Sequence, residues 1–324
     1  MYLLLCGLGI VCIFIASERK DRELKRIRTD LRHIPPEWIT YRQTSLFACL
    51  VEGEPTCFAL LGESTFVIGS ANPSMLSLFD EKGTLLRKID LPEEPRAIVC
   101  GTPETILAGK IVVALPTQIV LYHAEGNREA SWELPDEQSD IRSLVLTPAH
   151  LFAADTGKRG IHRFDANGRW SMTFSRDFVV YASPITMAFS HRNNFLYITN
   201  PGKHRVEVFT QDGIHLPELS WGEPSGSLSG FVGCCNPIGL AVLDGGRILT
   251  VEKAISRIKI FRAGGGVGEL DCVVAGPGTL EDVPIASGRT PAEPGGRYFA
   301  AVPLPHGDIA VFDYVYAVVR VFSP

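Results

Sequence analysis

Two adjacent cysteines, Cys234 and Cys235, are the residues of this chain with the most distinctive chemistry. Neighbouring thiols can bind a soft metal ion, form a vicinal disulfide or act as a redox pair. Two ligands are too few for a closed zinc site, which uses four, and His204 is the best candidate for a third. The alternative is that both cysteines fill a loop, because free cysteine packs as a small apolar residue.

Polar residues at two corners between strands extend this candidate site. His204 and Arg205 follow an apolar strand, and Glu252 with Lys253 occupies the equivalent corner one repeat later. A charged corner that recurs is also typical of repeat architecture, in which such a pair ties the corner to the next strand. The predicted ligand-binding set is His204, Arg205, Cys234, Cys235, Asn236, Glu252 and Lys253.

The sequence contains no motif that defines a catalytic set. A nucleophile elbow, a phosphate-binding loop and an HExxH motif are absent, and the eight histidines show no repeated position on the expected inner strands. We therefore predict no catalytic residues. The identity of any metal or cofactor stays unknown at this stage, and so does the question of whether the protein is an enzyme.

These residues lie within a repeated unit, which must position them. Five times an aromatic residue is followed four positions later by glycine, at intervals of roughly 40 to 60 residues. Two apolar strands precede each aromatic residue, and a further strand follows the glycine turn. Four short strands in each unit of about 40 residues is the β-propeller period. The five pairs are Phe79/Gly83, Tyr122/Gly126, Phe164/Gly168, Phe209/Gly213 and Phe261/Gly265.

A sixth unit ends at Val319–Phe322 without its outer strand. We expect the N-terminal side to supply that strand, from Trp38–Tyr41 or from Ser45–Cys49, because the pairing would close the ring and remove an exposed edge. The predicted fold is therefore an all-β, six-bladed β-propeller over residues 37–324, monomeric and closed by an N-terminal strand. An irregular two-sheet sandwich is the alternative, and the regular aromatic-to-glycine offset argues against it.

The strands expected to line the channel carry Ala, Leu, Val, Met, Phe and Ser, and no carboxylate. Hard cations such as calcium bind six to eight oxygen ligands. A calcium site of the kind found in propeller lactonases is therefore poorly supported.

Three sequence elements resemble a known family. Asn200–Arg205 reads Asn-Pro-Gly-Lys-His-Arg, Gly233–Pro237 reads Gly-Cys-Cys-Asn-Pro, and Glu252–Lys253 follows them. In this order they resemble a group of bacterial NHL-repeat β-propeller proteins of unknown function, which commonly start with a hydrophobic segment. The resemblance covers roughly residues 50 to 324 and is weak in blade two, where Leu115–Thr117 replaces the family's Asp-containing corner. It implies a fold and no established chemistry.

The N-terminus is hydrophobic and then highly charged. Residues 1–17 are almost wholly apolar and predict a hydrophobic helix that acts as a membrane anchor or signal-like segment, although a comfortable span needs about 20 residues. Residues 18–36 predict a charged stalk that ends at Pro35-Pro36. We expect an extracytoplasmic propeller, although the basic residues after the apolar run argue for the opposite side by the positive-inside rule.

The composition is that of an ordinary globular protein, with 45% hydrophobic and 21% charged residues. A formal net charge of -5 gives no support for nucleic-acid binding. Our leading interpretation is a membrane-tethered binding or scaffold module, with a protein partner or a ligand on the face that carries Cys234 and Cys235. The second is a redox or metal-binding protein that uses this pair with His204, and the third is a propeller hydrolase or lyase.

Overall fold

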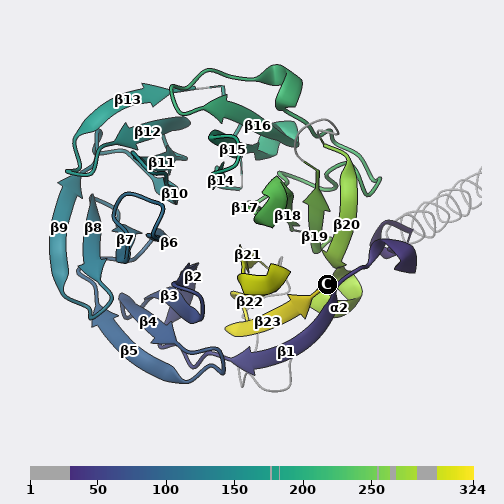
Figure 1. Cartoon of the computed structure of the whole chain (residues 1–324), viewed down its shortest axis with the longest axis horizontal. Coiled ribbons are helices and arrows are strands. Elements are labelled where there is room, and N and C mark those ends of the chain that lie inside the picture. Colours follow the sequence, from purple (N-terminus) through teal and green to yellow (C-terminus); the bar gives the residue numbers. More distant parts are fainter. Residues whose placement is uncertain (1–29, 176, 182, 254, 263–267, 283–297) are drawn as a thin grey trace, which may run out of the picture.

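The structure is a computed structural model that describes residues 30–175, 177–181, 183–253, 255–262, 268–282 and 298–324. In this part of the chain six antiparallel sheets stand around a central axis, and each sheet is one blade of a propeller (Figure 1). The chain passes through the blades in sequence order. The prediction of an all-β, six-bladed β-propeller is confirmed.

Each blade starts with an inner strand beside the axis. The inner strands are β2 (Glu54–Leu61), β6 (Ala97–Cys100), β10 (Ile141–Leu146), β14 (Met187–Ser190), β17 (Gly239–Val242) and β21 (Phe299–Pro303). The second strands are β3 (Thr65–Ala71), β7 (Lys110–Ala114), β11 (Leu151–Asp155), β15 (Phe195–Asn200), β18 (Ile248–Glu252) and β22 (Ile309–Asp313).

The third strands lead to the rim of the ring. They are β4 (Met75–Phe79), β8 (Gln118–His123), β12 (Gly160–Phe164), β16 (Arg205–Thr210), β19 (Arg257–Phe261) and β23 (Val318–Ser323). The outer strands are β5 (Leu85–Asp90), β9 (Arg128–Glu133), β13 (Trp170–Phe174), β20 (Leu270–Ala275) and β1 (Arg42–Ala48). The short helices are η1 (Pro36–Trp38), η2 (Pro201–Lys203), η3 (Pro217–Leu219), η4 (Asp244–Gly246), α2 (Pro277–Leu280) and η5 (Pro305–Gly307).

Burial explains why the strands differ in sequence. The middle strands are covered on both faces by neighbouring blades, so β7 is a continuous apolar run in which Val112 and Val113 are fully buried. The outer strand β9 has one covered face, so Trp132 is buried between exposed neighbours. The change from continuous to alternating apolar residues therefore follows the path from hub to rim.

Close packing between blades requires the glycine of the repeat. Gly168 has φ +77, and a Cβ atom there would lie 2.2 Å from the ring of Trp132 on the outer strand of the preceding blade. A Cβ atom on Gly213 would lie 2.6 Å from Phe174 in the same way. A larger residue would be strained by the positive φ and would push two blades apart. The fifth predicted glycine, Gly265, lies outside the described residues.

The ring is closed by pairing of the two ends of the described chain. β1 runs antiparallel to β23, from Arg42 opposite Ser323 to Ala48 opposite Val318. An N-terminal strand is therefore the outer strand of blade six, as predicted, and Ser45–Cys49 is the correct one of the two predicted segments. This pairing covers an edge that would otherwise offer unpaired backbone groups to another chain.

The other predicted segment, Trp38–Tyr41, is not an outer strand. Trp38 belongs to η1, which begins at Pro36, and Ile39 forms a single parallel bridge with Val273 of blade five. Tyr41 is 6% exposed and packs into the core between blades five and six. The segment therefore joins two blades instead of completing one.

Blade four has three strands in the described structure, so the expectation of a regular fourth strand is wrong there. The segment after β16 makes only isolated bridges, Phe209 with His215 and Val206 with Trp221. Pro217 starts η3 within this segment and has no backbone N–H to donate to a ladder. The rim of blade four is thus covered by an irregular segment.

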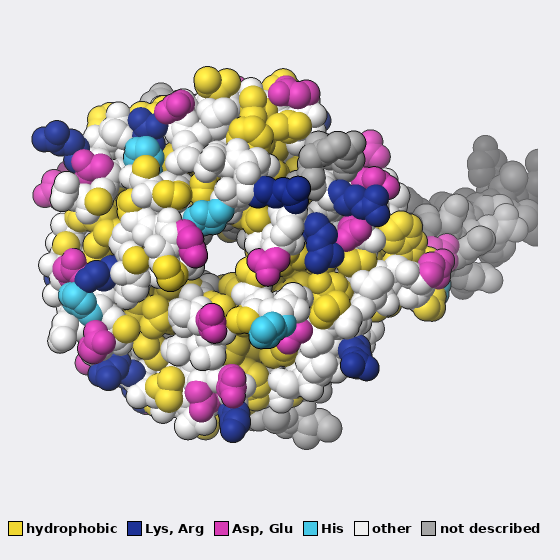
Figure 2. All heavy atoms as spheres, in the orientation of Figure 1, with side chains coloured by type: hydrophobic (Ala, Val, Ile, Leu, Met, Phe, Trp, Pro, Cys, Tyr) yellow, Lys and Arg dark blue, Asp and Glu magenta, His cyan; other side chains and the backbone are white. Residues whose placement is uncertain are grey.

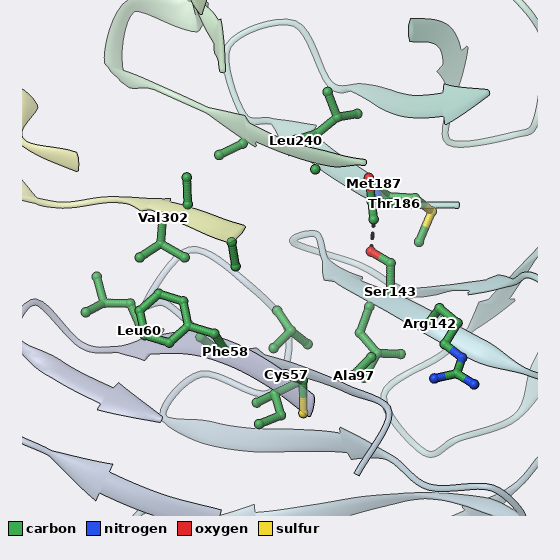
Figure 3. A pocket seen from close by; sticks show the side chains of 18 of the residues that line it. Cys57, Phe58, Leu60, Ala97, Arg142, Ser143, Thr186, Met187, Leu240 and Val302 are labelled. Carbon is green, nitrogen blue, oxygen red and sulfur yellow. Dashed lines mark hydrogen bonds between the residues drawn. The ribbon is translucent and has the colours of Figure 1, made fainter. Parts of the chain in front are cut away.

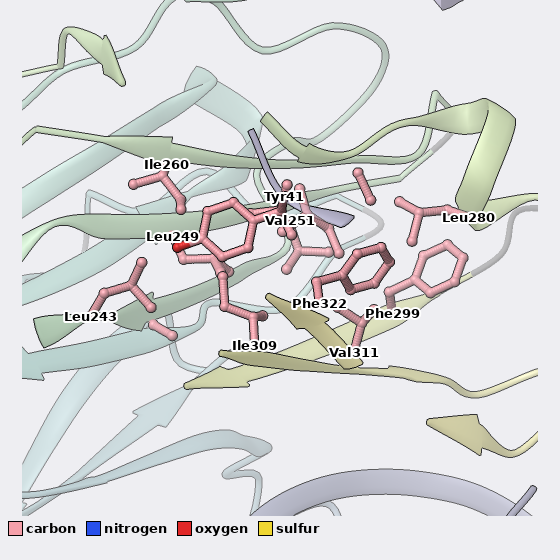
Figure 4. Packing of buried hydrophobic residues seen from close by; sticks show 14 of the residues in the cluster. Tyr41, Leu243, Leu249, Val251, Ile260, Leu280, Phe299, Ile309, Val311 and Phe322 are labelled. Carbon is pink, nitrogen blue, oxygen red and sulfur yellow. The ribbon is translucent and has the colours of Figure 1, made fainter. Parts of the chain in front are cut away.

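The hydrophobic core lies between neighbouring blades. Figure 4 shows one such layer, in which Val251 and Ile260 of blade five meet Ile309 and Phe322 of blade six. Burying a large apolar side chain contributes about 1.5 to 3 kcal/mol relative to exposure. Each blade buries its apolar faces only when both neighbours are present, which is why the ring must close.

Buried polar pairs recur at the corner between the second and third strands. One member stands at or next to the end of the second strand, and the other lies seven positions later in the third strand. Blade one has Ser70/Ser77 and blade two has the apolar pair Ala114/Leu121. The polar pairs of blades three to six are Asp155/His162, Asn200/Glu207, Glu252/Lys259 and Asp313/Arg320, all buried.

In three blades the first member of the pair also holds the chain that enters the blade. Asp155 accepts a hydrogen bond from the backbone N–H of Asp140 at 3.0 Å, and Asn200 accepts one from Val179 at 2.9 Å. Glu252 accepts one from the backbone N–H of Val232 at 3.1 Å. The recurring charged corner is therefore part of the repeat architecture and fixes the connections between blades.

The predicted membrane helix, residues 1–17, and most of the predicted stalk, residues 18–36, lie outside the described residues. Residues 30–32 are helical, and the chain lies against blade five, where Arg257 donates a hydrogen bond to the carbonyl of Leu31. Within the described ranges, no helix is both long and apolar enough to cross a membrane.

Candidate functional site

One face of the ring gathers the long connections. Strands alternate in direction within a blade, so the chain enters each inner strand and turns from the second to the third strand on the same side. We call this side the connection face. It carries the connection from β13 to β14 and the one from β16 to β17. Cys234 and Cys235 lie in the latter, between blades four and five, where the sequence predicted them.

The two thiols are in contact, with their Sγ atoms 3.0 Å apart. Cys234 is exposed, whereas Cys235 is 1% exposed and has φ +61. The carbonyl of Cys235 accepts a hydrogen bond from the hydroxyl of Ser183 at 2.9 Å, which anchors the loop to the preceding connection. A hydrogen bond from the Cys234 thiol to the Cys235 sulfur, together with the negative charge that Cys235 carries when deprotonated, raises the pKa of Cys234.

Asn236 holds this loop in place. Its side-chain amide donates to the carbonyls of Val232 at 2.6 Å and Lys253 at 3.0 Å, and its oxygen accepts the backbone N–H of Lys253 at 2.9 Å. The side chain is fully buried and these bonds use its hydrogen-bonding groups. Asn236 thus positions the cysteines, and its predicted contact with a ligand would have to be indirect.

His204 and Arg205 are also engaged with the connection from β16 to β17. The Nδ1 atom of His204 lies 3.2 Å from the carbonyl of Phe231, and Arg205 donates to the carbonyl of Ser220 at 3.4 Å. Across the described ranges, no group of three or more His, Cys, Asp or Glu side chains is arranged to hold a metal ion. The structure does not assemble the predicted site of two thiols and His204.

Glu252 is fully buried in an ion pair with Lys259, whose Nζ lies 2.6 Å from its Oε1 atom. Lys259 also donates to the carbonyls of Leu228 at 2.9 Å and Gly230 at 2.6 Å. Burial lowers the pKa of Lys259, and the neighbouring Glu252 carboxylate opposes that shift. The partner of Glu252 is thus in the next strand, and the pair holds the connection that leads to the cysteines.

Lys253 joins the cysteine loop to the centre of the ring. Its ammonium lies 5.8 Å from the ring centroid of Tyr298, within cation–π distance, and Tyr298 lines the axial cavity. The positive charge of Lys253 also favours the thiolate of Cys234. Lys253 itself is buried, so Cys234 is the exposed member of the predicted set, and His204 and Arg205 are half-buried.

The axial cavity has a volume of about 660 Å³ and touches all six inner strands (Figure 3). Its walls are mostly apolar, with Phe58, Leu60, Met187, Leu240 and Val302 among the lining residues. Figure 2 shows an opening at the centre of the ring. Small-molecule sites commonly enclose about 300 to 1,000 Å³, so this space is large enough for a ligand.

Two arginines at the cavity are functional candidates that the sequence reading missed. Arg96 and Arg142 line it, and both guanidinium groups reach the Oδ1 atom of Asp140, at 2.9 Å and 2.8 Å respectively. Among the described lining residues they are the only charged ones. The available signal was a basic residue at the start of the inner strand in two consecutive blades, β6 and β10.

A polar network inside blade three has the order of a catalytic triad. Asp155 Oδ2 lies 3.0 Å from His162 Nε2, and His162 Nδ1 lies 2.7 Å from the hydroxyl of Thr173. Burial raises the pKa of Asp155, but the bond to His162 and two backbone amides outweigh it and hold the pKa at about 2. Because Asp155 and His162 occupy the corner positions that are polar in five of the six blades, we assign this network a structural role.

Comparison with known proteins supports the fold alone. No protein-family model and no curated protein sequence matches the chain. A virginiamycin B lyase from Staphylococcus aureus superposes with a TM-score of 0.58 and 11% identity, covering 88% of this chain and 99% of the lyase. The lyase has also been solved as a catalytically inactive His-to-Ala variant with quinupristin.

Two further structures are similar. A structure described as streptogramin B lyase has a TM-score of 0.59 and 12% identity, covering 88% of this chain and 98% of its own. A protein of unknown function from Bacteroides thetaiotaomicron has a TM-score of 0.57 and 12% identity, covering 84% and 70%. The chain is thus a six-bladed propeller that resembles the virginiamycin B lyase-like proteins in fold. At this identity the likeness says nothing about activity.

Proposed function

We propose that this protein is a binding module whose ligand enters the axial channel from the connection face. The observation that carries the proposal is the apolar cavity of about 660 Å³ at the hub, beside the face where the long connections are fixed by buried polar groups. The exposed Cys234 lies on this face, and the buried Lys253 packs against Tyr298 of the cavity lining. A convergent set of catalytic groups at the cavity is not needed for this function.

The channel can be tested with N-phenyl-1-naphthylamine, an uncharged dye that fluoresces in apolar surroundings. We expect saturable binding of one dye per chain. Replacing Ala301 with Phe on inner strand β21 should weaken that binding, because the larger ring occupies space in the cavity. The matched control is Ala130→Phe on outer strand β9, far from the hub, which should leave dye binding unchanged.

Circular dichroism and thermal melting of both variants would confirm that each is folded. If both variants lose dye binding equally, the dye responds to disturbed packing of the whole protein and not to the channel. Dye binding that is unaffected by Ala301→Phe in a folded protein would exclude the channel as the site and would contradict the proposal.

We further propose that residues 1–17 tether the module to a membrane and that residues 18–36 form its stalk. The blades would be NHL-type repeats in a monomeric, extracytoplasmic ring. A protein partner or a ligand would bind on the connection face. The apolar N-terminal sequence and the resemblance in blades four and five support this part. Fractionation of cells that make the full chain should leave it in the pellet after a carbonate wash.

A second candidate function is thiol–disulfide redox chemistry. The specific observation is the 3.0 Å contact between the Sγ atoms of Cys234 and Cys235, which places the two sulfurs within reach of a disulfide bond. The exposed Cys234 would react first and the buried Cys235 would resolve the product. This function does not depend on His204.

The lyase interpretation has less support. Among the structural neighbours are lyases, and one inactive variant lacks a single histidine. In the described part of this chain no histidine lines the axial cavity. The binding and redox functions therefore explain more of the site.

A further inference from the structure

Among the described residues that line the axial cavity, the two charged ones lie at the same end. Arg96 directly precedes inner strand β6, and Arg142 is the second residue of inner strand β10. All inner strands run in the same direction around the ring, so both arginines lie where these strands begin, at the connection face. The opposite end is lined by uncharged residues that include Thr102, Val145 and Pro303.

The two guanidinium groups are not neutralised by their one shared partner. Asp140 Oδ1 accepts from Arg96 Nη1 at 2.9 Å and lies 2.8 Å from Arg142 Nε, so two positive charges share a single carboxylate. The contact of Arg142 involves Nε alone, and its side chain is 39% exposed. Part of the Arg142 guanidinium is therefore exposed to solvent beside the cavity, where its remaining N–H groups can reach the head of a ligand at the mouth.

The rest of the cavity favours an apolar, elongated occupant. An inner strand of five residues such as β21 spans about 17 Å, and the lining along it is formed by side chains such as Ala301 and Val302. Figure 3 shows the labelled apolar side chains surrounding the space, with Arg142 at one edge of the group. A chain molecule would bury its length along the axis, gaining roughly 0.8 kcal/mol for each CH₂ group removed from water.

From this geometry, and resting on the proposed channel-binding function, we propose that the ligand is a single-chain anionic amphiphile. Its apolar chain lies along the channel, and its anionic head meets Arg142 and Arg96 at the connection face. Guanidinium groups bind carboxylate and phosphate oxygens through paired, charge-assisted hydrogen bonds. A cationic head would be disfavoured here, since two guanidinium groups outnumber the one carboxylate, Asp140, that contacts them.

The test compares cis-parinaric acid, a fluorescent fatty acid, with its uncharged methyl ester. We expect the full-length protein to bind the acid at least about tenfold more tightly than the ester, since a hydrogen bond to a charged group contributes roughly 1.5 kcal/mol or more. Arg142→Gln should remove most of this preference without weakening ester binding. Arg128→Gln, on the exposed face of outer strand β9, is the matched control and should keep the preference.

A second variant should change the affinity for the acid in the opposite direction. Asp140→Asn removes the carboxylate that competes for the two guanidinium groups, so acid binding should become tighter while ester binding stays the same. Displacement of cis-parinaric acid by palmitate and by hexadecyl phosphate would then show whether a carboxylate or a phosphate head fits better. Either order of affinity supports an anionic amphiphile.

The outcomes separate this inference from the proposed function. If the acid and the ester bind equally well, or if Arg142→Gln leaves the preference intact, the anionic head is excluded. If the uncharged dye still binds and Ala301→Phe still blocks it, the channel remains a binding site for a neutral ligand. If neither the dye nor either parinarate binds, both proposals fail.

Discussion

Cys234 and Cys235 differ in access although their sulfurs are 3.0 Å apart. Four other described cysteines, Cys49, Cys57, Cys100 and Cys272, are buried, and burial raises the pKa of each thiol. A thiol must be deprotonated and accessible to attack a disulfide. The pKa of Cys234 is raised as well, by its neighbour Cys235, so access decides: among the described cysteines, Cys234 is the exposed one and is positioned to start the reaction.

In a Cys6→Ser/Cys12→Ser background, 5,5′-dithiobis(2-nitrobenzoate) should release two equivalents of thionitrobenzoate per native chain. The Cys234 thiolate attacks the reagent and releases the first. The Cys235 thiolate then attacks the Cys234 sulfur of the mixed disulfide, which releases the second and forms the Cys234–Cys235 disulfide. Absorbance gives the stoichiometry, and mass spectrometry should show a loss of two hydrogens.

The matched variant is Cys235→Ala, which should release one equivalent and keep the mixed disulfide. A stable mixed disulfide in the parent background would mean that Cys235 cannot reach its neighbour, and the redox function would be excluded.

Asp155 makes the folded state sensitive to acid. Its pKa of about 2 in the folded chain lies below the ordinary value near 4, so its contribution is fully present above about pH 4 and is lost as the pH falls through 2. Asp155→Asn should lower the free energy of unfolding at pH 7 by about 2 kcal/mol and narrow that difference at pH 2. Urea unfolding at several pH values measures it.

Asp90→Asn on exposed strand β5 serves as the control and should change the unfolding free energy little at any pH. A constant difference between Asp155→Asn and the parent chain from pH 7 to pH 2 would show that Asp155 contributes through packing alone and not as a carboxylate.

At the scale of elements, the buried pair Glu252–Lys259 fixes the connection from β16 to β17. Lys259→Met removes the ammonium and leaves the Glu252 carboxylate buried without its counter-ion, which should destabilise the protein by about 3 to 5 kcal/mol. The double variant Glu252→Gln/Lys259→Met should recover part of this loss, because no uncompensated charge remains. Urea midpoints of the parent and both variants give the comparison.

Lys88→Met provides the control, since Lys88 forms an exposed ion pair with Glu52 on the rim and should cost less than about 1 kcal/mol. If Lys259→Met costs no more than Lys88→Met, the buried pair does not hold the connection, and the cysteine loop must be positioned mainly by Asn236.

Several elements could be predicted from the sequence because a single packing constraint leaves a recognisable residue pattern in each of them. The glycine turns are visible in the sequence because Gly168 and Gly213 pack against Trp132 and Phe174, where a Cβ atom does not fit. The inner and middle strands are visible because both of their faces are buried. The Cys234–Cys235 loop could be placed on a connection because its neighbours include Gly233 and Pro237.

Other features depend on tertiary context that one sequence does not contain. The missing outer strand of blade four follows from the 3-10 turn at Pro217, in a segment whose apolar residues still suit a strand. The charged end of the channel was missed because Arg96 and Arg142 adjoin apolar strands, and only the ring geometry shows that both converge on Asp140. Glu252 was placed in the predicted ligand-binding set because its partner, Lys259, lies on another strand and the sequence does not show that the two are paired.

At the scale of the whole molecule, closure joins the N-terminal strand to the C-terminal one. In the β1–β23 pair, Arg42 lies opposite Ser323, so the start of one strand is beside the end of the other. Residues 30–41 lead to this strand along blade five, with Ile34 buried and Tyr41 in the core between blades five and six. We therefore expect that β1 closes the ring by pairing with β23, whether it stands at the N-terminal or the C-terminal end of the chain.

A circular permutant tests this. It begins at Leu50, continues to Pro324 and adds a Gly/Ser linker of about 20 residues, which reaches about 25 Å, before residues 30–49. Because every native strand pair can form and closure of the linker costs only about 3 kcal/mol, the melting temperature of the permutant should lie within about 5 °C of that of the chain 30–324. A chain that begins at Leu50 and lacks β1 should aggregate, since it exposes the edge of β23 and leaves blade six incomplete. If the truncated chain has the same melting temperature as the parent, the ring is stable without its closing strand. If the permutant is unfolded, closure requires the native order of the strands in the chain.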